Sequence, residues 1–238
     1  MQLSETSALK KACIYSLPPN HLGYCGPKGS WSSFSKFISN PSLEKAGEIK
    51  KLLNEFYALH PYLELIAKAN NLDVFDDSVI EAYWIGNSLL ENVPAESIKK
   101  TIRSFKFHGM PERISEEKAE GLPEGMFPHH SMHVLYINFI SRKVEPVIEN
   151  LSNCLVLWGE IKEVSEKGLK IKGTELLAEG GEIKLREKEK TVQNPLSLQP
   201  KAGDMISVHW NNAMEILSEE RLNSLKKYTL HTLSAAKN

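Results

Sequence analysis

The chain has 238 residues, of which 41% are hydrophobic and 25% charged, so it can bury enough apolar surface to fold as a globular protein. Lysine and arginine number 29 against 30 aspartate and glutamate residues, and this balance gives no indication of a nucleic-acid partner. No stretch approaches the roughly 20 apolar residues of a membrane span, and the N-terminus lacks the apolar run of a signal peptide. We therefore expect a cytoplasmic protein with no membrane partner.

The cysteines agree with a reducing compartment. Cys13, Cys25 and Cys154 are widely spaced and odd in number, which is not typical of a secreted disulfide framework. Each thiol could therefore be a ligand, a nucleophile or a packing residue.

Helices are predicted for most of the first half of the chain. The first forty residues are rich in proline, glycine and serine, which predicts a long ordered loop around Cys25. Apolar residues at helical spacing follow and predict four helices. Two of them lie within residues 41–70 and meet near His60, one begins at Asp76 and is closed by Pro94, and the last covers residues 94–105.

The next segment carries a cluster of histidines. Many glycines and prolines in residues 108–128 predict a loop that leads to the sequence Pro-His-His-Ser-Met-His at residues 128–133. The apolar and β-branched run at residues 133–140 favours a buried strand over a helix. A short helix is expected over residues 144–151.

Beyond residue 151, short segments of alternating polarity are separated by turn residues, which predicts the strands of a small barrel. The segments are residues 154–164, 168–177, 182–192 and 204–210. A serine followed by two glutamates at residues 218–220 predicts the start of a C-terminal helix. We predict an α+β protein with a mostly α-helical domain over residues 1–151 and a small OB-like β-barrel domain with a C-terminal helix over residues 152–238.

The C-terminal segment resembles the HypC/HupF chaperones of nickel-iron (NiFe) hydrogenase maturation. Residues Cys154 to Val164 are similar to the family's opening of cysteine, leucine, small apolar pair, proline, glycine and strand, with Trp158 in place of the proline. Residues Gly203 to Glu220 are similar to the family's Gly-Asp, histidine-bearing strand and acidic helix start. In that family the opening cysteine sits at the processed N-terminus and helps to hold an iron with cyanide and carbonyl ligands. The resemblance implies iron as cofactor and this role for Cys154, although this cysteine is internal and offers no free α-amine.

The N-terminal part resembles an uncharacterised prokaryotic family with LGYCGP and PHHSxHV motifs, which is associated with hydrogenase gene neighbourhoods. The matching residues are Pro18 to Asn20, Leu22 to Pro27, Glu81 to Asn87 and Pro128 to Val134. This second family has no established activity, and the HypC/HupF resemblance implies a hydrogenase subunit or another maturation protein as partner.

His129, His130 and His133 are candidate metal ligands, because neutral imidazole is among the commonest ligands in proteins. The alternative is that these rings form hydrogen bonds to loop carbonyls at a domain seam. Cys25 lies in a turn bounded by Gly-Pro, where a thiolate could bind a soft metal or attack an electrophile. A buried structural cysteine is the alternative.

Several residues are expected to line a pocket near these ligands. Glu81 could act as acid, base or ligand in a partly dry site. Alternatively, the helix dipole stabilises a glutamate in the N-terminal half of this helix, and its aromatic neighbours fill the core. The predicted pocket residues are Asn20, Tyr24, Glu81, Trp84 and Asn87.

Our hypothesis from the sequence is an accessory protein of metallocentre assembly that binds or passes an iron species to a client. The expected metal ligands are Cys25, His129, His130, His133 and Cys154. Two alternatives stay open: an enzyme with a pocket formed by Cys25, Glu81 and the three histidines, and a non-catalytic interaction module. Nucleotide-binding and dithiol motifs are missing from the sequence.

Overall fold

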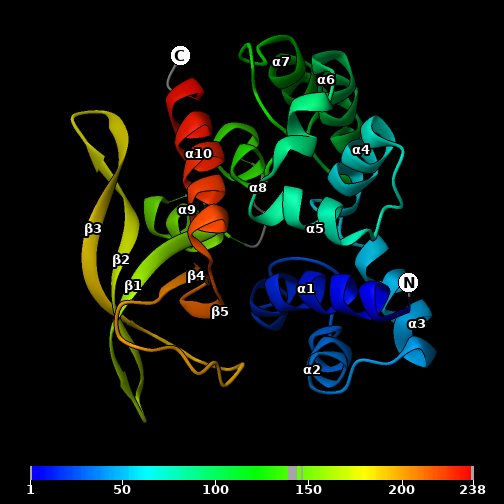
Figure 1. The fold of residues 1–238 in the computed structure, drawn as a ribbon. Helices are drawn as coiled ribbons and strands as arrows, with labels where there is room; N and C mark the ends of the chain where they lie inside the picture. Colours follow the sequence, from blue (N-terminus) through cyan, green and yellow to red (C-terminus); the bar gives the residue numbers. More distant parts are fainter. Residues whose placement is uncertain (1, 139–143, 146, 237–238) are drawn as a thin grey trace.

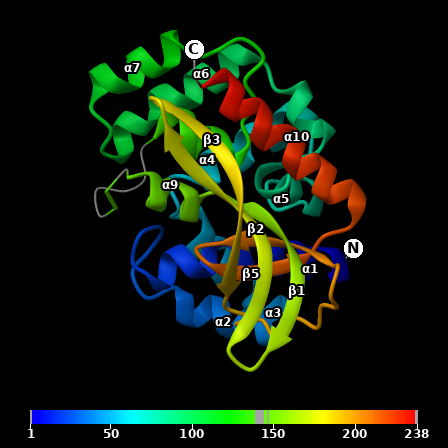
Figure 2. The ribbon, with the colours of Figure 1, turned by 90° about the vertical axis from the view of Figure 1, so that its left-hand side faces the viewer.

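The computed structural model describes residues 2–138, 144, 145 and 147–236. The helices of the first half pack together on one side, and an antiparallel sheet with the C-terminal helix α10 (Glu219–Ala235) lies on the other (Figure 1). Seen from the side of the sheet, the helices lie behind the strands (Figure 2). The predicted α+β class is confirmed.

The first segment differs from the prediction, because helices replace most of the predicted loop. Helix α1 spans Gln2–His21 and contains Pro18 and Pro19, and α2 spans Trp31–Ser39. The apolar side chains of α1 are buried in the main core, where it packs against α2, α3 and α5. The two prolines lie near the end of α1 and remove hydrogen bonds from its last turns. The free energy gained by burying the apolar side chains of the helix exceeds this loss. Only residues 22–30, which carry the Gly-Tyr-Cys-Gly-Pro sequence, remain a loop.

The next four helices follow the predicted pattern. Their bounds are Leu43–Asn54 for α3, His60–Asn70 for α4, Asp77–Trp84 for α5 and Ala95–Ser104 for α6. Asp76 caps α5, as predicted, by accepting a hydrogen bond from the N–H of Ser78. Helix α5 ends earlier than predicted, because the side chain of Asn87 accepts from the N–H of Leu89 and starts the separate 3-10 turn η1 (Ser88–Asn92).

The segment around the histidines is helical. After the 3-10 turn η2 (Phe105–His108), α7 (Glu112–Glu120) interrupts the predicted loop. The run predicted as a strand forms α8 (His130–Met132) and the π-helical turn η3 (His133–Ile137), and its residues 139 and 140 lie outside the described residues. The strand prediction was wrong because burial against the helical core overrides the β-propensity of this run.

The last helix before the sheet is α9 (Ile148–Cys154). It begins and ends later than the predicted helix over residues 144–151, of which residue 146 lies outside the described residues. Cys154 therefore ends a helix and does not open the first strand. The predicted domain boundary between residues 151 and 152 falls inside α9, and the division into two domains stays a prediction.

The five strands form one antiparallel sheet in the order β3-β2-β1-β4-β5. The bounds are Leu157–Ser165 for β1, Gly168–Glu179 for β2, Glu182–Val192 for β3, Met205–His209 for β4 and Asn212–Ile216 for β5. The sheet is open, although one isolated bridge joins Gln193, directly after β3, to Asn212. As predicted, α10 begins after Ser218, whose side chain accepts from the N–H of Arg221.

One hydrophobic core includes buried residues of the helical half and of the C-terminal half. Leu9 of α1, Trp84 of α5, Trp158 of β1 and Tyr228 of α10 all belong to it. A smaller second core contains buried residues of all five strands. Among the helices that the structure describes, none combines the length and the apolar character that a membrane span needs.

Candidate metal site

Three buried side chains that could bind a metal converge where the helical half meets the sheet. His130 begins α8, Cys154 ends α9 and His209 ends β4. One potential ligand atom of each residue lies within 4.8 Å of those of the other two. Nitrogen and sulfur donors in this combination suit zinc, iron or copper better than magnesium or calcium. The three residues could therefore hold a transition-metal ion.

Hydrogen bonds to backbone carbonyls orient both imidazoles. Nδ1 of His209 donates to the carbonyl oxygen of Tyr15 at 2.9 Å, and Nε2 of His130 donates to that of Cys154 at 2.8 Å. The lone pairs are thereby assigned to Nε2 of His209 and Nδ1 of His130. Histidine ligands of metals usually have their second ring nitrogen held in this way.

No donor in the part of the chain that the structure describes fully satisfies either of these two ring nitrogens as a hydrogen-bond acceptor. Nε2 of His209 is buried and has no hydrogen-bond partner among the described residues. Nδ1 of His130 lies 3.1 Å from the hydroxyl of Tyr83, but that hydroxyl also lies 2.6 Å from the carbonyl oxygen of Ala58. Since a phenol has one proton, it satisfies only one of these acceptors, and the shorter contact is to Ala58. Buried acceptors without donors are what a bound cation would satisfy.

Burial keeps the imidazoles neutral. It lowers the pKa of His130 to about 4 and, together with the nearby His130, lowers the pKa of His209 to about 3. Burial also raises the pKa of the Cys154 thiol well above its usual value, with a further contribution from Cys25. A metal ion reverses this last effect, because a coordinating thiol loses its proton.

The three residues line a cavity of about 30 Å³, which has room for an ion or a single water but not for a metabolite. Cys25 lines the same cavity and is only partly buried, whereas the other three are buried. With Cys25 the donor set becomes two nitrogens and two sulfurs, a combination typical of tetrahedral zinc or iron sites.

The loop that carries Cys25 is held by its neighbours. The amide nitrogen of the Asn20 side chain donates to the carbonyl oxygens of Cys25 and Pro27, each at 2.8 Å. Gly26 has a φ of +75°, and a Cβ on it would lie 2.2 Å from the ring of Phe56, which itself lines the cavity. Glycine is therefore required here for both conformation and space.

Aromatic rings close the cavity on the side of α5. Trp84 stacks on Tyr15 with centroids 5.1 Å apart, and its ring centroid lies 4.6 Å from that of His130 and 5.6 Å from that of His209. Tyr83 lies at the edge of His130, with ring centroids 5.4 Å apart. This close packing fixes the ring positions.

The two other histidines of the predicted cluster lie elsewhere. Nδ1 of His129 lies 2.7 Å from the hydroxyl of Ser131, which donates to Thr232 of α10. Nδ1 of His133 lies 3.1 Å from the hydroxyl of Tyr62. Neither ring lines the cavity. The contact of His133 with Tyr62 joins η3 to α4, and Ser131, the partner of His129, joins α8 to α10. Both rings are buried, but their contacts are to side-chain hydroxyl groups, whereas the alternative to metal binding predicted bonds to loop carbonyls.

Of the predicted pocket residues, Trp84 lines the cavity and Asn20 supports its loop. Tyr24 packs on Trp210, with ring centroids 4.8 Å apart. Asn87 donates to the carbonyl oxygen of Ser78 at 2.8 Å and holds the end of α5. These last two residues lie outside the cavity.

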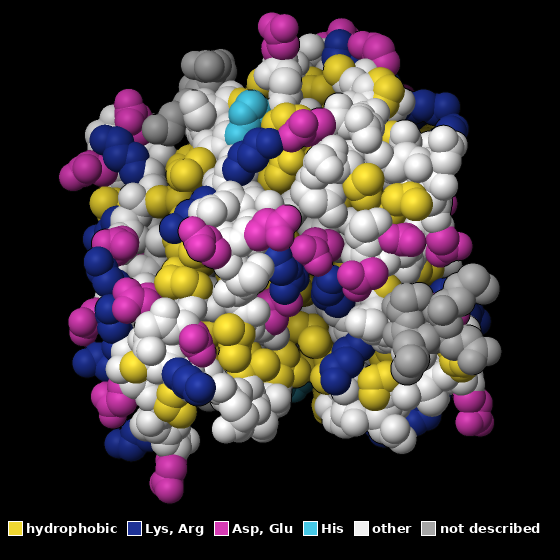
Figure 3. All heavy atoms as spheres, viewed as in Figure 1, with side chains coloured by type: hydrophobic (Ala, Val, Ile, Leu, Met, Phe, Trp, Pro, Cys, Tyr) yellow, Lys and Arg dark blue, Asp and Glu magenta, His cyan; other side chains and the backbone are white. Residues whose placement is uncertain are grey.

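Glu81 also lies outside the cavity, in a network of charges. Its carboxylate lies 2.8 Å from Nζ of Lys11 and 3.0 Å from Nε of Arg221, which also pairs with Glu215. Burial alone would raise the pKa of Glu81, but Lys11 and Arg221 outweigh it and lower that pKa. Acidic and basic side chains meet on the molecular surface where α1, α5 and the start of α10 come together (Figure 3). Glu81 therefore joins three elements of the fold.

His209 was not among the predicted ligands. In the sequence it is a single histidine in an apolar strand, which is more often a packed residue than a ligand. The available signal was the histidine-bearing strand in the HypC/HupF resemblance, which includes this position. His209 and Cys154 are 55 positions apart, so no local sequence pattern indicates that the two side chains lie close together.

Comparison with known proteins gives a family but no activity. No curated protein and no solved structure matches the chain. A family of unknown function, DUF6390, matches residues 7–238, which is nearly the whole chain. The chain therefore belongs to the DUF6390 family.

Proposed function

We propose that this protein binds a metal ion at His130, Cys154 and His209, with Cys25 as a fourth ligand at the partly exposed side of the cavity. The observation that carries the proposal is the convergence of the three buried ligand atoms within 4.8 Å of one another. Two neutral imidazoles held by backbone carbonyls and an ion-sized cavity support it further.

The proposed role is that of an accessory protein of metallocentre assembly, which binds or passes an iron species in nickel-iron hydrogenase maturation. The resemblance to HypC/HupF chaperones supports iron, because it aligns Cys154 with the cysteine that holds iron in that family. In this proposal the open sheet with its bridge at Gln193 corresponds to the small barrel, and the partner is a hydrogenase subunit or another maturation protein in the cytoplasm.

A donor on a partly exposed loop favours transfer over a permanent structural ion. Cys25 belongs to the loop between α1 and α2, while the other three donors are buried at the ends of regular elements. An ion that leaves by the exposed side would therefore break its bonds to the buried donors first and remain in contact with Cys25 on its way out.

The enzyme alternative has less support. Glu81, which that alternative needs as acid or base, is engaged with Lys11 and Arg221, and His129 and His133 lie outside the cavity. A volume of about 30 Å³ also leaves no room for an organic substrate beside the ligands.

Anaerobic purification followed by elemental analysis and infrared spectroscopy tests the proposal. We expect about one metal ion per chain, lost on Cys154→Ser and on His209→Ala but retained on Cys13→Ser, which removes a buried thiol of α1 outside the cavity. Iron with bands in the cyanide and carbonyl stretching region would support the hydrogenase role, whereas zinc would keep the site and remove that role. A protein that is purified without metal and binds neither Fe²⁺ nor Zn²⁺ would overturn the proposal and favour the interaction module.

A further inference from the structure

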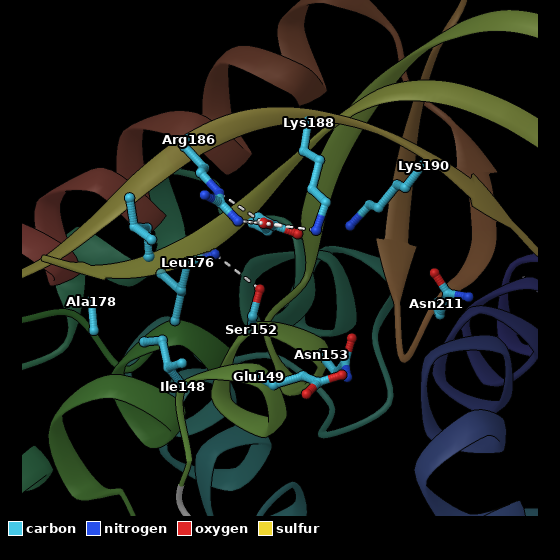
Figure 4. A pocket seen from close by; sticks show the side chains of 12 residues that line it. Ile148, Glu149, Ser152, Asn153, Leu176, Ala178, Arg186, Lys188, Lys190 and Asn211 are labelled. Atoms are coloured by element: carbon cyan, nitrogen blue, oxygen red, sulfur yellow. Dashed lines mark hydrogen bonds and ion pairs between the residues drawn. The ribbon is translucent and has the colours of Figure 1, made fainter.

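A second, much larger cavity of about 630 Å³ lies between α9 and the β2–β3 hairpin. Its lining is shown in Figure 4. This volume falls in the range of small-molecule sites, roughly 300–1,000 Å³. Its wall includes Asn153, which directly precedes Cys154, and Asn211, which lies two residues after His209. The two cavities therefore share the ends of α9 and β4 but have different linings.

The alternating sequence of β3 places cations on the face that lines this cavity. Arg186, Lys188 and Lys190 project from β3 toward α9 (Figure 4). The intervening Glu187 and Glu189 point to the other face, where they pair with Lys172 and Lys170 of β2. Read along the sequence, the strand looks balanced in charge, but its cavity face is basic.

The carboxylates of the lining do not neutralise these cations. Glu175 lies 2.6 Å from Arg186 and 3.3 Å from Lys188, so a single carboxylate serves two cations. Glu149, on α9, makes no ion pair with any residue that the structure describes. Three cations against two carboxylates leave the lining with a positive charge.

Lys190 is the clearest unpaired charge. No carboxylate of the described residues lies within ion-pair distance of its ammonium group, which donates only to the carbonyl oxygen of Thr174 at 3.1 Å. Its side chain lies over Gly173, where a Cβ would come within 2.8 Å of the lysine Cε. The missing side chain at Gly173 therefore makes room for this lysine across the sheet. A partly buried ammonium group without a counter-ion is stabilised by an anion that enters the cavity.

The remainder of the lining suits a small molecule with an apolar part. Ile148, Leu176 and Ala178 form an apolar end of the cavity, and the side chains of Asn153 and Asn211 line it away from that end (Figure 4). A ligand could place an anionic group between the lysines and the asparagine amides and its apolar part against the leucine.

We propose that this cavity is a binding site for a small anionic molecule that carries a carboxylate or phosphate group, held by Lys188 and Lys190 with Arg186. The proposal does not rest on the metal site, since none of the cavity's residues is a proposed metal ligand.

Calorimetric titration of the full chain at low salt tests this site with two probes, pyrophosphate for the phosphate group and succinate for the carboxylate. We expect at least one probe to bind with a stoichiometry of one, and Lys188→Gln/Lys190→Gln to weaken its binding about tenfold or more. The matched control is Lys170→Gln/Lys172→Gln, which removes the same charge from the other face of the sheet and should leave binding within about twofold. Amide resonances of the Asn153 and Asn211 side chains should shift during the titration.

Failure of both probes to bind would overturn the proposal. So would equal weakening by the two double variants, since that result would indicate only a general attraction of anions to surface lysines. Binding of pyrophosphate alone would assign the site to phosphate-bearing ligands, and binding of succinate alone would assign it to carboxylates. Metal content is not part of this readout, so the outcome is independent of the first proposal.

Discussion

Pro19 of α1 leaves the carbonyl oxygen of Tyr15 open to His209 of β4. In a regular helix the N–H of residue 19 would donate to the carbonyl of residue 15, but proline has no N–H. That carbonyl instead accepts from Nδ1 of His209 at 2.9 Å, which leaves Nε2 of this ring as the potential ligand atom. The proline that looked like a loop residue thus fixes the tautomer of a histidine 190 positions away.

This relationship predicts that one substitution weakens metal binding without lowering the stability of the fold. Pro19→Ala restores the N–H, which competes for the Tyr15 carbonyl and frees the imidazole of His209 to rotate. We expect metal affinity to fall about 10-fold to 100-fold, as for other residues that orient a ligand, while the free energy of unfolding stays equal or rises. Competition with a chelator and denaturant unfolding measure the two quantities.

The control for this prediction is Pro18→Ala, which restores an N–H toward the carbonyl of Ile14, a residue outside the cavity lining. It should leave metal affinity unchanged. Equal loss of affinity in both variants would indicate a general change in the end of α1 and would contradict the role of the Tyr15 carbonyl.

Acid should destabilise the metal-free protein steeply. Burial lowers the pKa of His129 to about 3, that of His130 to about 4 and that of His209 to about 3, against about 6.5 in an unfolded chain. Between these limits the unfolded state binds more protons than the folded state, so stability is greatest above pH 6.5 and falls as the pH decreases. Three protons correspond to a limiting slope of about 4 kcal/mol per pH unit, which is approached near about pH 5 and is smaller toward pH 7.

Denaturant unfolding at several pH values between about 5 and 7 measures this slope. His209→Gln should lower it by one proton, about 1.4 kcal/mol per pH unit. A stability that does not change over this range would mean that the buried histidines are not neutral in the folded state or are not buried.

Removal of Cys25 should change the rate of metal release more than the capacity for metal. The three buried donors remain in Cys25→Ala, so the variant should still bind about one ion per chain, but a chelator should remove it about tenfold faster or more. Cys13→Ala is the matched thiol control, because Cys13 is fully buried in α1 and outside the cavity. Release at the wild-type rate from the Cys25 variant would exclude this thiol as a ligand.

Glu81 should be structural. Glu81→Gln removes a charge from a partly buried site but leaves Lys11 and Arg221 in place, and we expect the free energy of unfolding to fall by about 1–3 kcal/mol. Metal content should not change, because Glu81 does not line the cavity. The pair of the exposed Glu96 and the half-buried Lys99 provides the control, and Glu96→Gln should lower stability by less than about 0.5 kcal/mol. Loss of metal from the Glu81 variant would contradict a purely structural role for this residue.

Local patterns in the sequence were sufficient for much of the fold. The helices over residues 41–105, the cap at Asp76, the C-terminal helix after Ser218 and the segments of β1 to β4 all follow from spacing and capping residues. These features depend on neighbours within a few positions, which the sequence displays directly.

The errors lie where distant parts of the chain decide the structure. Prolines and glycines before residue 41 predicted a loop, but burial against α2, α3 and α5 makes most of that segment helical. The run at residues 133–137 has the composition of a strand, yet its apolar side chains pack into the helical core. In both segments the free energy of burial exceeds the local preference.

The candidate metal site likewise has features that the sequence predicted and features that depend on distant parts of the chain. The sequence by itself identified Cys25, His130 and Cys154 as residues able to bind a metal, because that ability belongs to the side chain. Only the tertiary structure separated His130 from His129 and His133, added His209 and removed Glu81 from the pocket. A ligand set depends on the directions of side chains from α8, α9 and β4, and those directions are fixed by packing between elements that lie far apart in the chain.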